Sequence, residues 1–125
     1  MNKRSITTKD QMNFEISFYE GVVRQKPNYV EALIPLAEAY TRKGLHEKGL
    51  EIDRRLARIL KDDPVVHYNL ACSYALLEKK AESLKALRRA IRLGYCDLEH
   101  LKNDSDLKCL HTEPAFQKIL GNLCT

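Results

Sequence analysis

The chain has 125 residues, of which 44% are hydrophobic and 30% charged, and its formal net charge is +4 at pH 7. This length suits one domain with its own core and excludes two independent ones. The mild charge permits binding to anionic surfaces without requiring it. Few Gly or Pro residues and many Ala, Leu, Glu, Lys and Arg residues favour helix throughout, so we expect an all-α protein.

The first nine residues, 1–9, are predicted to be a flexible N-terminus. Lys3 and Arg4 lie there without an apolar run behind them, so we expect neither a signal peptide nor a transmembrane span. A cytoplasmic location is the default expectation. In that compartment cysteines stay reduced, and free thiols are predicted at Cys72, Cys96, Cys109 and Cys124.

Residues 10–26 are predicted to form an N-terminal helix that ends before Pro27. Its apolar residues have helical spacing, and we expect Phe14, Phe18 and Val22 to face inward, with Tyr19 and Val23 as further candidates. We interpret this helix as the second helix of a truncated repeat.

A period of 34 residues runs through the middle of the chain. The matching pairs include Leu36 with Leu70, Ala37 with Ala71, Tyr40 with Tyr74, Arg54 with Arg88, Arg55 with Arg89, and Arg58 with Arg92. Two full units follow, 30–63 and 64–97. Each contains two stretches of helical periodicity, which predicts a helix hairpin.

Start and stop signals support these hairpins. Asn28 with Glu31 three residues later predicts an N-cap and capping box, and Asp63 before Pro64 predicts a second start. Left-handed glycines are predicted to close helices at Gly44 and Gly94. The remaining residues, 98–125, carry apolar residues in short pieces, and we predict a C-terminal cap that covers the end of the helical stack.

The leucine, small and tyrosine positions at Leu36, Ala37 and Tyr40, repeated one unit later, resemble the tetratricopeptide repeat family. The resemblance implies a tetratricopeptide-like α-solenoid of antiparallel helix hairpins in a single domain, residues 10–125. Asp53 departs from the family pattern, which prefers an aromatic residue there. The closing stretch looks like a tail that follows such repeats in bacterial proteins.

The resemblance implies a protein-binding scaffold whose concave groove is lined by the first helices and takes a peptide or helix. The groove positions carried over are Ile34, Glu38, Tyr68, Asn69, Cys72 and Leu76. The alternative is that the C-terminal cap or a second copy of the chain covers this surface. Asn69 occupies the place where family members hold the backbone of a bound peptide, although an ordinary solvated amide or an intramolecular hydrogen bond is the favoured explanation. Glu38 would repel the terminal carboxylate of a chaperone tail, which excludes that ligand.

The second helices carry a possible basic stripe, formed by Arg54, Arg55, Arg58, Arg88, Arg89 and Arg92. It could meet nucleic acid or an acidic protein. A solvated face explains it as well, because Glu51 can pair with Arg55 and no aromatic residues interleave with the arginines. Nucleic acid is therefore the less favoured partner.

Cys96, His100, Cys109 and His111 are residue types that bind zinc, but their spacing lacks the usual paired pattern, and we predict no metal and no cofactor. No motif for catalysis is present, so we predict that the protein is not an enzyme. The leading hypothesis is an adaptor for another protein of unknown identity. Self-association as a homodimer is the alternative, since short solenoids expose apolar ends.

Overall fold

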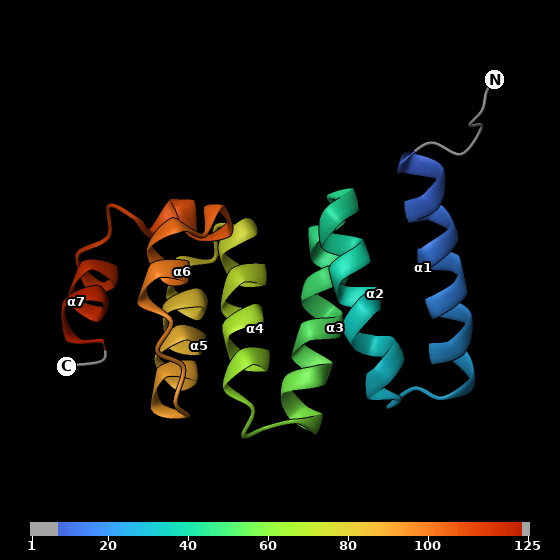
Figure 1. Cartoon of the computed structure of the whole chain (residues 1–125), viewed down its shortest axis with the longest axis horizontal. Helices are drawn as coiled ribbons and strands as arrows, with labels where there is room; N and C mark the ends of the chain where they lie inside the picture. Colours follow the sequence, from blue (N-terminus) through green and yellow to red (C-terminus); the bar gives the residue numbers. More distant parts are fainter. Residues whose placement is uncertain (1–7, 124–125) are drawn as a thin grey trace. The chain divides into compact units, whose positions relative to one another are not determined.

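The computed structural model describes residues 8–123, and every regular element within that range is helical. The elements are α1 (Thr8–Gln25), α2 (Val30–Lys43), α3 (His46–Ile59), α4 (Pro64–Leu76), α5 (Lys80–Arg92), α6 (Leu98–Asn103), the 3-10 helix η1 (Ser105–Leu110) and α7 (Pro114–Asn122) (Figure 1). The residues group into two compact units, one up to Ile52 and the other from Asp53 onward, and each is described separately.

The period of 34 residues reappears in the helix boundaries. The first helices of the two repeats begin at Val30 and Pro64, and the second helices begin at His46 and Lys80. The expected all-α fold with two helix hairpins is therefore confirmed. Most of the predicted flexible N-terminus lies outside the described residues, as does Cys124, whereas Thr8 and Lys9 already belong to α1.

The first unit, residues up to Ile52, is built on the contact between α1 and α2. Ile16 of α1 is buried there, and the Tyr40 hydroxyl of α2 donates a hydrogen bond to the Glu20 carboxylate of α1. Gly49 is buried against α2, where an added Cβ would lie 3.2 Å from the Thr41 hydroxyl oxygen. That contact explains why this position takes a residue without a side chain.

The helix caps differ in how well they were predicted. Asp63 caps α4 as expected, because its carboxylate accepts hydrogen bonds from the amides of Val65 and Val66 at 2.9 and 3.2 Å. Gly44 closes α2 with a φ of 84°, also as expected. The N-cap prediction at Asn28 is wrong. The cap of α2 is Tyr29, which makes no side-chain bond, so Asn28 lies one residue too early.

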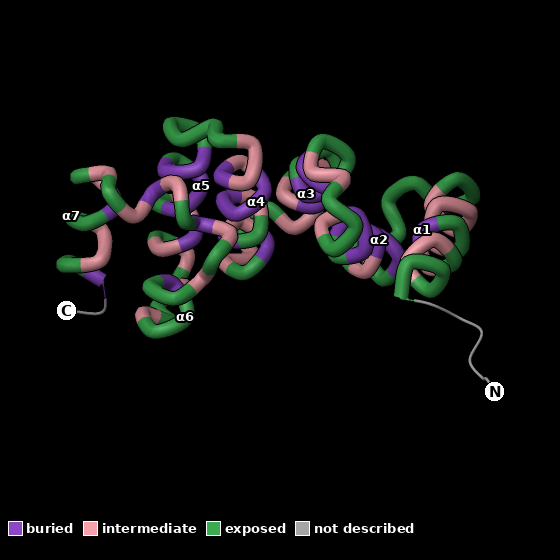
Figure 2. The backbone as a smooth tube through the Cα atoms, turned by 90° about the horizontal axis from the view of Figure 1, so that it is seen from above, coloured by how far each residue is buried: buried purple, intermediate pink, exposed green. Residues whose placement is uncertain are grey.

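The second unit, from Asp53 onward, centres on α4 and α5, which lie side by side and run antiparallel (Figure 1). Buried residues concentrate along these two helices, whereas α1 is mostly exposed or half-buried (Figure 2). The Ser83 hydroxyl donates to the carbonyl oxygen of Ala71 at 2.7 Å and ties the pair together. Buried Asp53 accepts a hydrogen bond from the Ser73 hydroxyl, which gives this departure from the repeat pattern a polar partner.

The C-terminal tail, which consists of α6, η1 and α7 in residues 98–123, covers α4 and α5. In the second unit η1 packs on α4, and α7 packs on α5. The side chains that the tail contributes fully buried to the core of this unit are Leu101, Leu107, Leu110 and Phe116. Segments that have too few residues to be stable alone are therefore held by apolar burial against the repeat.

Candidate interaction surfaces

The tail covers the middle of α4, where the sequence predicts an open groove. Tyr68 is 3% exposed and Cys72 is 7% exposed. The Tyr68 ring stacks on the Tyr95 ring with centroids 4.3 Å apart and planes 9° apart, and it also contacts the His100 ring at 5.5 Å. Of the two alternatives expected for this surface, the structure shows the covered one at Tyr68 and Cys72, because the chain's own C-terminal cap lies over them.

Asp104 holds the tail in this position. One carboxylate oxygen, Oδ2, accepts a hydrogen bond from the Tyr68 hydroxyl at 2.5 Å, and the Cys72 sulfur lies 3.7 Å from it. The other, Oδ1, accepts from the amide of Asp106 at 3.0 Å and so caps η1. His100 Nε2 lies 3.3 Å from Oδ2. Sequence reasoning missed this role. The only available signal was the pattern Asp104-Ser105-Asp106 before an apolar residue, which is typical of a cap.

The other predicted groove residues are accessible but belong to different units. Asn69 is exposed on α4 and Leu76 is half-buried near its end. Ile34, at 38% exposure, and exposed Glu38 lie on α2 of the first unit. Their part in binding stays a prediction.

Burial shapes the ionisation of the groups under the tail. It raises the pKa of the Cys72 thiol, and the nearby carboxylates of Asp104 and Asp106 raise it further. Burial likewise raises the pKa of the Tyr68 hydroxyl and takes that of Tyr95 to about 12. These groups therefore stay protonated in the folded chain at pH values where an unfolded chain would ionise.

An alkaline loss of stability follows from these shifts. In the unfolded chain, thiols lose their proton near pH 9.0 and phenols near pH 10.0. The folded groups lose theirs at higher pH, so the unfolded state binds fewer protons in this alkaline range. The free energy of unfolding should be fully retained below pH 9.0 and should fall as the pH rises above it. Urea unfolding under reducing conditions measures this. Between pH 9.0 and 10.0, Cys72→Ala should reduce the rate at which the free energy of unfolding falls with pH. If that rate is the same as in the wild type, the thiol is not buried as described.

The outer face of α1 carries exposed aromatic side chains. Phe14 is 72% exposed and Phe18 is 55% exposed, and their rings stack with centroids 6.4 Å apart. At 3.6 residues per turn, each lies about 160° around the helix from Ile16, the residue buried toward α2. The prediction that these two phenylalanines face inward is therefore wrong. The further candidates, Tyr19 and Val23, are half-buried, as is Val22.

The predicted basic stripe lies wholly in the second unit, on α3 and α5. Arg89 contacts an acidic residue, since its guanidinium lies 3.4 Å from the Asp62 carboxylate. Arg55 is half-buried, and the exposed members are Arg54, Arg58, Arg88 and Arg92. Binding of a partner to this stripe stays a prediction.

Metal-ligating side chains gather at one place among the described residues, under the tail. Ligand atoms of Cys72, Asp104 and Asp106 lie within 4.8 Å of one another. The fold already uses Asp104 there, as the cap of η1 and the acceptor for Tyr68. No such group is formed by the residues that the sequence suggests for zinc, which are Cys96, His100, Cys109 and His111.

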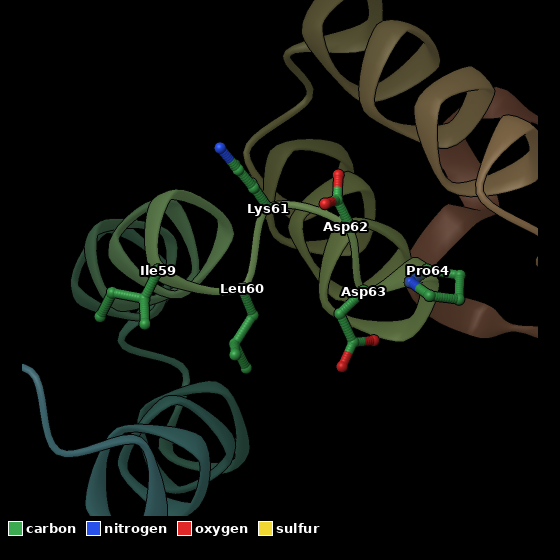
Figure 3. Close-up of a pocket in the computed structure, with 6 residues that line it drawn as sticks. All are labelled: Ile59, Leu60, Lys61, Asp62, Asp63 and Pro64. Carbon is green, nitrogen blue, oxygen red and sulfur yellow. The ribbon is translucent and has the colours of Figure 1, made fainter.

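A shallow depression lies at the loop between α3 and α4 and is lined by residues 59–64 (Figure 3). Two contacts hold this loop. The carbonyl oxygen of Lys61 lies 2.8 Å from His67 Nε2 and accepts a weaker bond from Arg89 at 3.4 Å. The Asp63 carboxylate already accepts the hydrogen bonds that cap α4. The depression is therefore a wide, open surface on a loop that these contacts hold in place. Its side chains do not converge on a common point (Figure 3).

Comparison with known proteins identifies the fold. A chloroplastic protein from Arabidopsis thaliana is 31% identical over 87 residues, which make up 65% of this chain and 25% of that protein. The chain thus spans a quarter of the curated relative it matches. The crystal structure of MamA, a tetratricopeptide-like helical protein, matches with a TM-score of 0.70 at 20% identity and covers 92% of this chain and 70% of that one. No family model matches the chain.

The described helices also bear on membrane insertion. None of them combines the length and the apolar character that crossing a bilayer requires.

Proposed function

Since the chain has the fold of tetratricopeptide-repeat proteins, we propose that it is a non-catalytic protein-interaction module whose contact surface is the outer face of α1. The observation that carries this proposal is the exposure of Phe14 and Phe18 side by side. Contiguous exposed apolar side chains on a folded protein typically mark a site of interaction.

The exposed apolar side chains cluster in the first unit. Large hydrophobic residues with high exposure among the described residues are Phe14, Phe18, Tyr29, Ile34 and Val65, and only Val65 belongs to the second unit. Removing what remains exposed of Phe14 and Phe18 from water would supply roughly 2–4 kcal/mol before the costs of association. Two stacked aromatic rings on a rigid helix also lose little entropy on binding.

The spacing of the two phenylalanines indicates what kind of partner α1 takes. Phe14 and Phe18 lie four residues apart, about one helical turn, so their stacked rings form a short apolar strip along one side of α1. An amphipathic helix of another protein can lay its apolar side over such a strip.

The test is affinity enrichment followed by titration of the purified partner. Replacing Phe14 and Phe18 together by glutamine should weaken the partner's binding by about tenfold or more, because two buried anchors are lost. Val65→Gln is the matched control, since it removes an exposed apolar side chain in the other unit and should leave binding unchanged. Equal retention of every partner by both variants would refute the assignment of this face.

Self-association is the competing use of the same face. If light scattering shows a dimer that the Phe14 and Phe18 replacements dissociate, the partner helix is the α1 of a second copy. A monomer at high concentration leaves the partner as a different protein.

A further inference from the structure

Four exposed arginines of the second unit have no acidic partner within the described chain. Arg54 and Arg58 lie one turn apart on α3, and Arg88 and Arg92 lie one turn apart on α5. The ion pairs among the described residues include none of the four, nor does any of them take part in a further contact. We call these four residues the arginine surface.

The arginine surface spans α3 and α5. Arg89 donates a hydrogen bond to the carbonyl oxygen of Lys61 at 3.4 Å, which places the last turn of α5 beside the loop that follows α3. The 34-residue offset gives the two arginine pairs equivalent positions in the repeat. Within each pair the spacing along the helix axis is about 6 Å, so each helix presents two guanidinium groups one turn apart.

This charge arrangement is unfavourable in the isolated chain. Like charges four residues apart on a helix repel one another, and no ion pair among the described residues includes any of the four arginines. Carboxylates of a partner would remove that repulsion and bind guanidinium groups in two-pronged hydrogen bonds. We propose that the arginine surface binds an acidic segment of a protein, at a site separate from the outer face of α1.

Nucleic acid is the poorer match for the same charge. Single strands bind by stacking bases on aromatic side chains, and the highly exposed large hydrophobic residue of the second unit is aliphatic Val65. A short acidic peptide needs no such stacking of bases.

The test measures binding of a labelled glutamate-rich peptide to the full chain by fluorescence anisotropy at low salt. Arg54, Arg58, Arg88 and Arg92 are replaced together by glutamine. We expect the affinity to drop by about tenfold, and we expect wild-type binding to weaken steeply with added salt. All four side chains are exposed, so the variant should fold, which circular dichroism checks.

A control variant separates the site from net charge. It replaces four exposed lysines outside the arginine surface by glutamine and so loses the same charge, and these lysines are Lys9, Lys79, Lys108 and Lys118. The proposal requires the control to bind the peptide nearly as well as wild type. Equal weakening in both variants, no peptide binding at low salt, or tighter binding of a single-stranded oligonucleotide of equal charge would each overturn it. Unchanged peptide binding by the Phe14 and Phe18 variant would show that the two surfaces act independently.

Discussion

Phe116→Ala is expected to lower the free energy of unfolding by about 3–5 kcal/mol, the usual cost of removing a buried phenylalanine ring from a core. Phe116 is fully buried, and it stacks on His111 with ring centroids 5.6 Å apart. It anchors α7 in the core of the second unit. Because that core includes most of the tail, the loss should appear in the main urea unfolding transition of this unit.

The matched control is Phe14→Ala, which makes the same chemical change at a side chain that is 72% exposed. Its effect on stability should stay within about 0.5 kcal/mol, as for most surface substitutions. If the two alanine variants unfold at similar urea concentrations, α7 does not pack as described.

Asp104→Ala should cost about 2–4 kcal/mol, the second largest effect. The change removes the cap of η1, worth about 1 kcal/mol, and leaves the buried Tyr68 hydroxyl without its acceptor, which costs about 1–3 kcal/mol. Urea unfolding measures the total. Faster reaction of Cys72 with a thiol reagent, in a background in which Cys96, Cys109 and Cys124 are replaced by serine, would report release of the tail.

Two further variants separate the contributions of Asp104. Asp104→Asn keeps one acceptor oxygen, which can serve the cap of η1 but not Tyr68 as well, so it should recover only the contribution of the cap, about 1 kcal/mol. Tyr68→Phe added to Asp104→Ala removes the unpaired hydroxyl and should cost little more than Asp104→Ala alone. Strictly additive losses in the double variant would mean that Tyr68 and Asp104 do not interact.

Local signals predicted the repeat well, because each depends on neighbours in sequence. A cap such as Asp63 and a left-handed glycine such as Gly44 act within a turn of the helix they bound. The period of 34 residues is likewise a property of the chain alone. Asn28 failed by one position, which lies within the uncertainty of helix ends read from sequence.

The interaction surfaces were harder to predict because they depend on long-range packing. Helical periodicity groups residues by face, but α1 has apolar residues on two faces, at Ile16 and at Phe14 with Phe18, and only the position of α2 decides which is buried. Tyr68 was expected in an open groove. Its cover is fixed by Asp104, 36 residues away, through contacts that no local pattern encodes.

The contact between Asp104 and Tyr68 makes the tail a tethered competitor for the face of α4. A ligand for that face could bind only the fraction of molecules whose tail has left, so its apparent affinity would equal the intrinsic affinity multiplied by that fraction. Each 1.4 kcal/mol by which the tail favours the closed state would therefore weaken such a ligand about tenfold. Changes at Asp104 would set the threshold concentration for occupancy without touching the ligand.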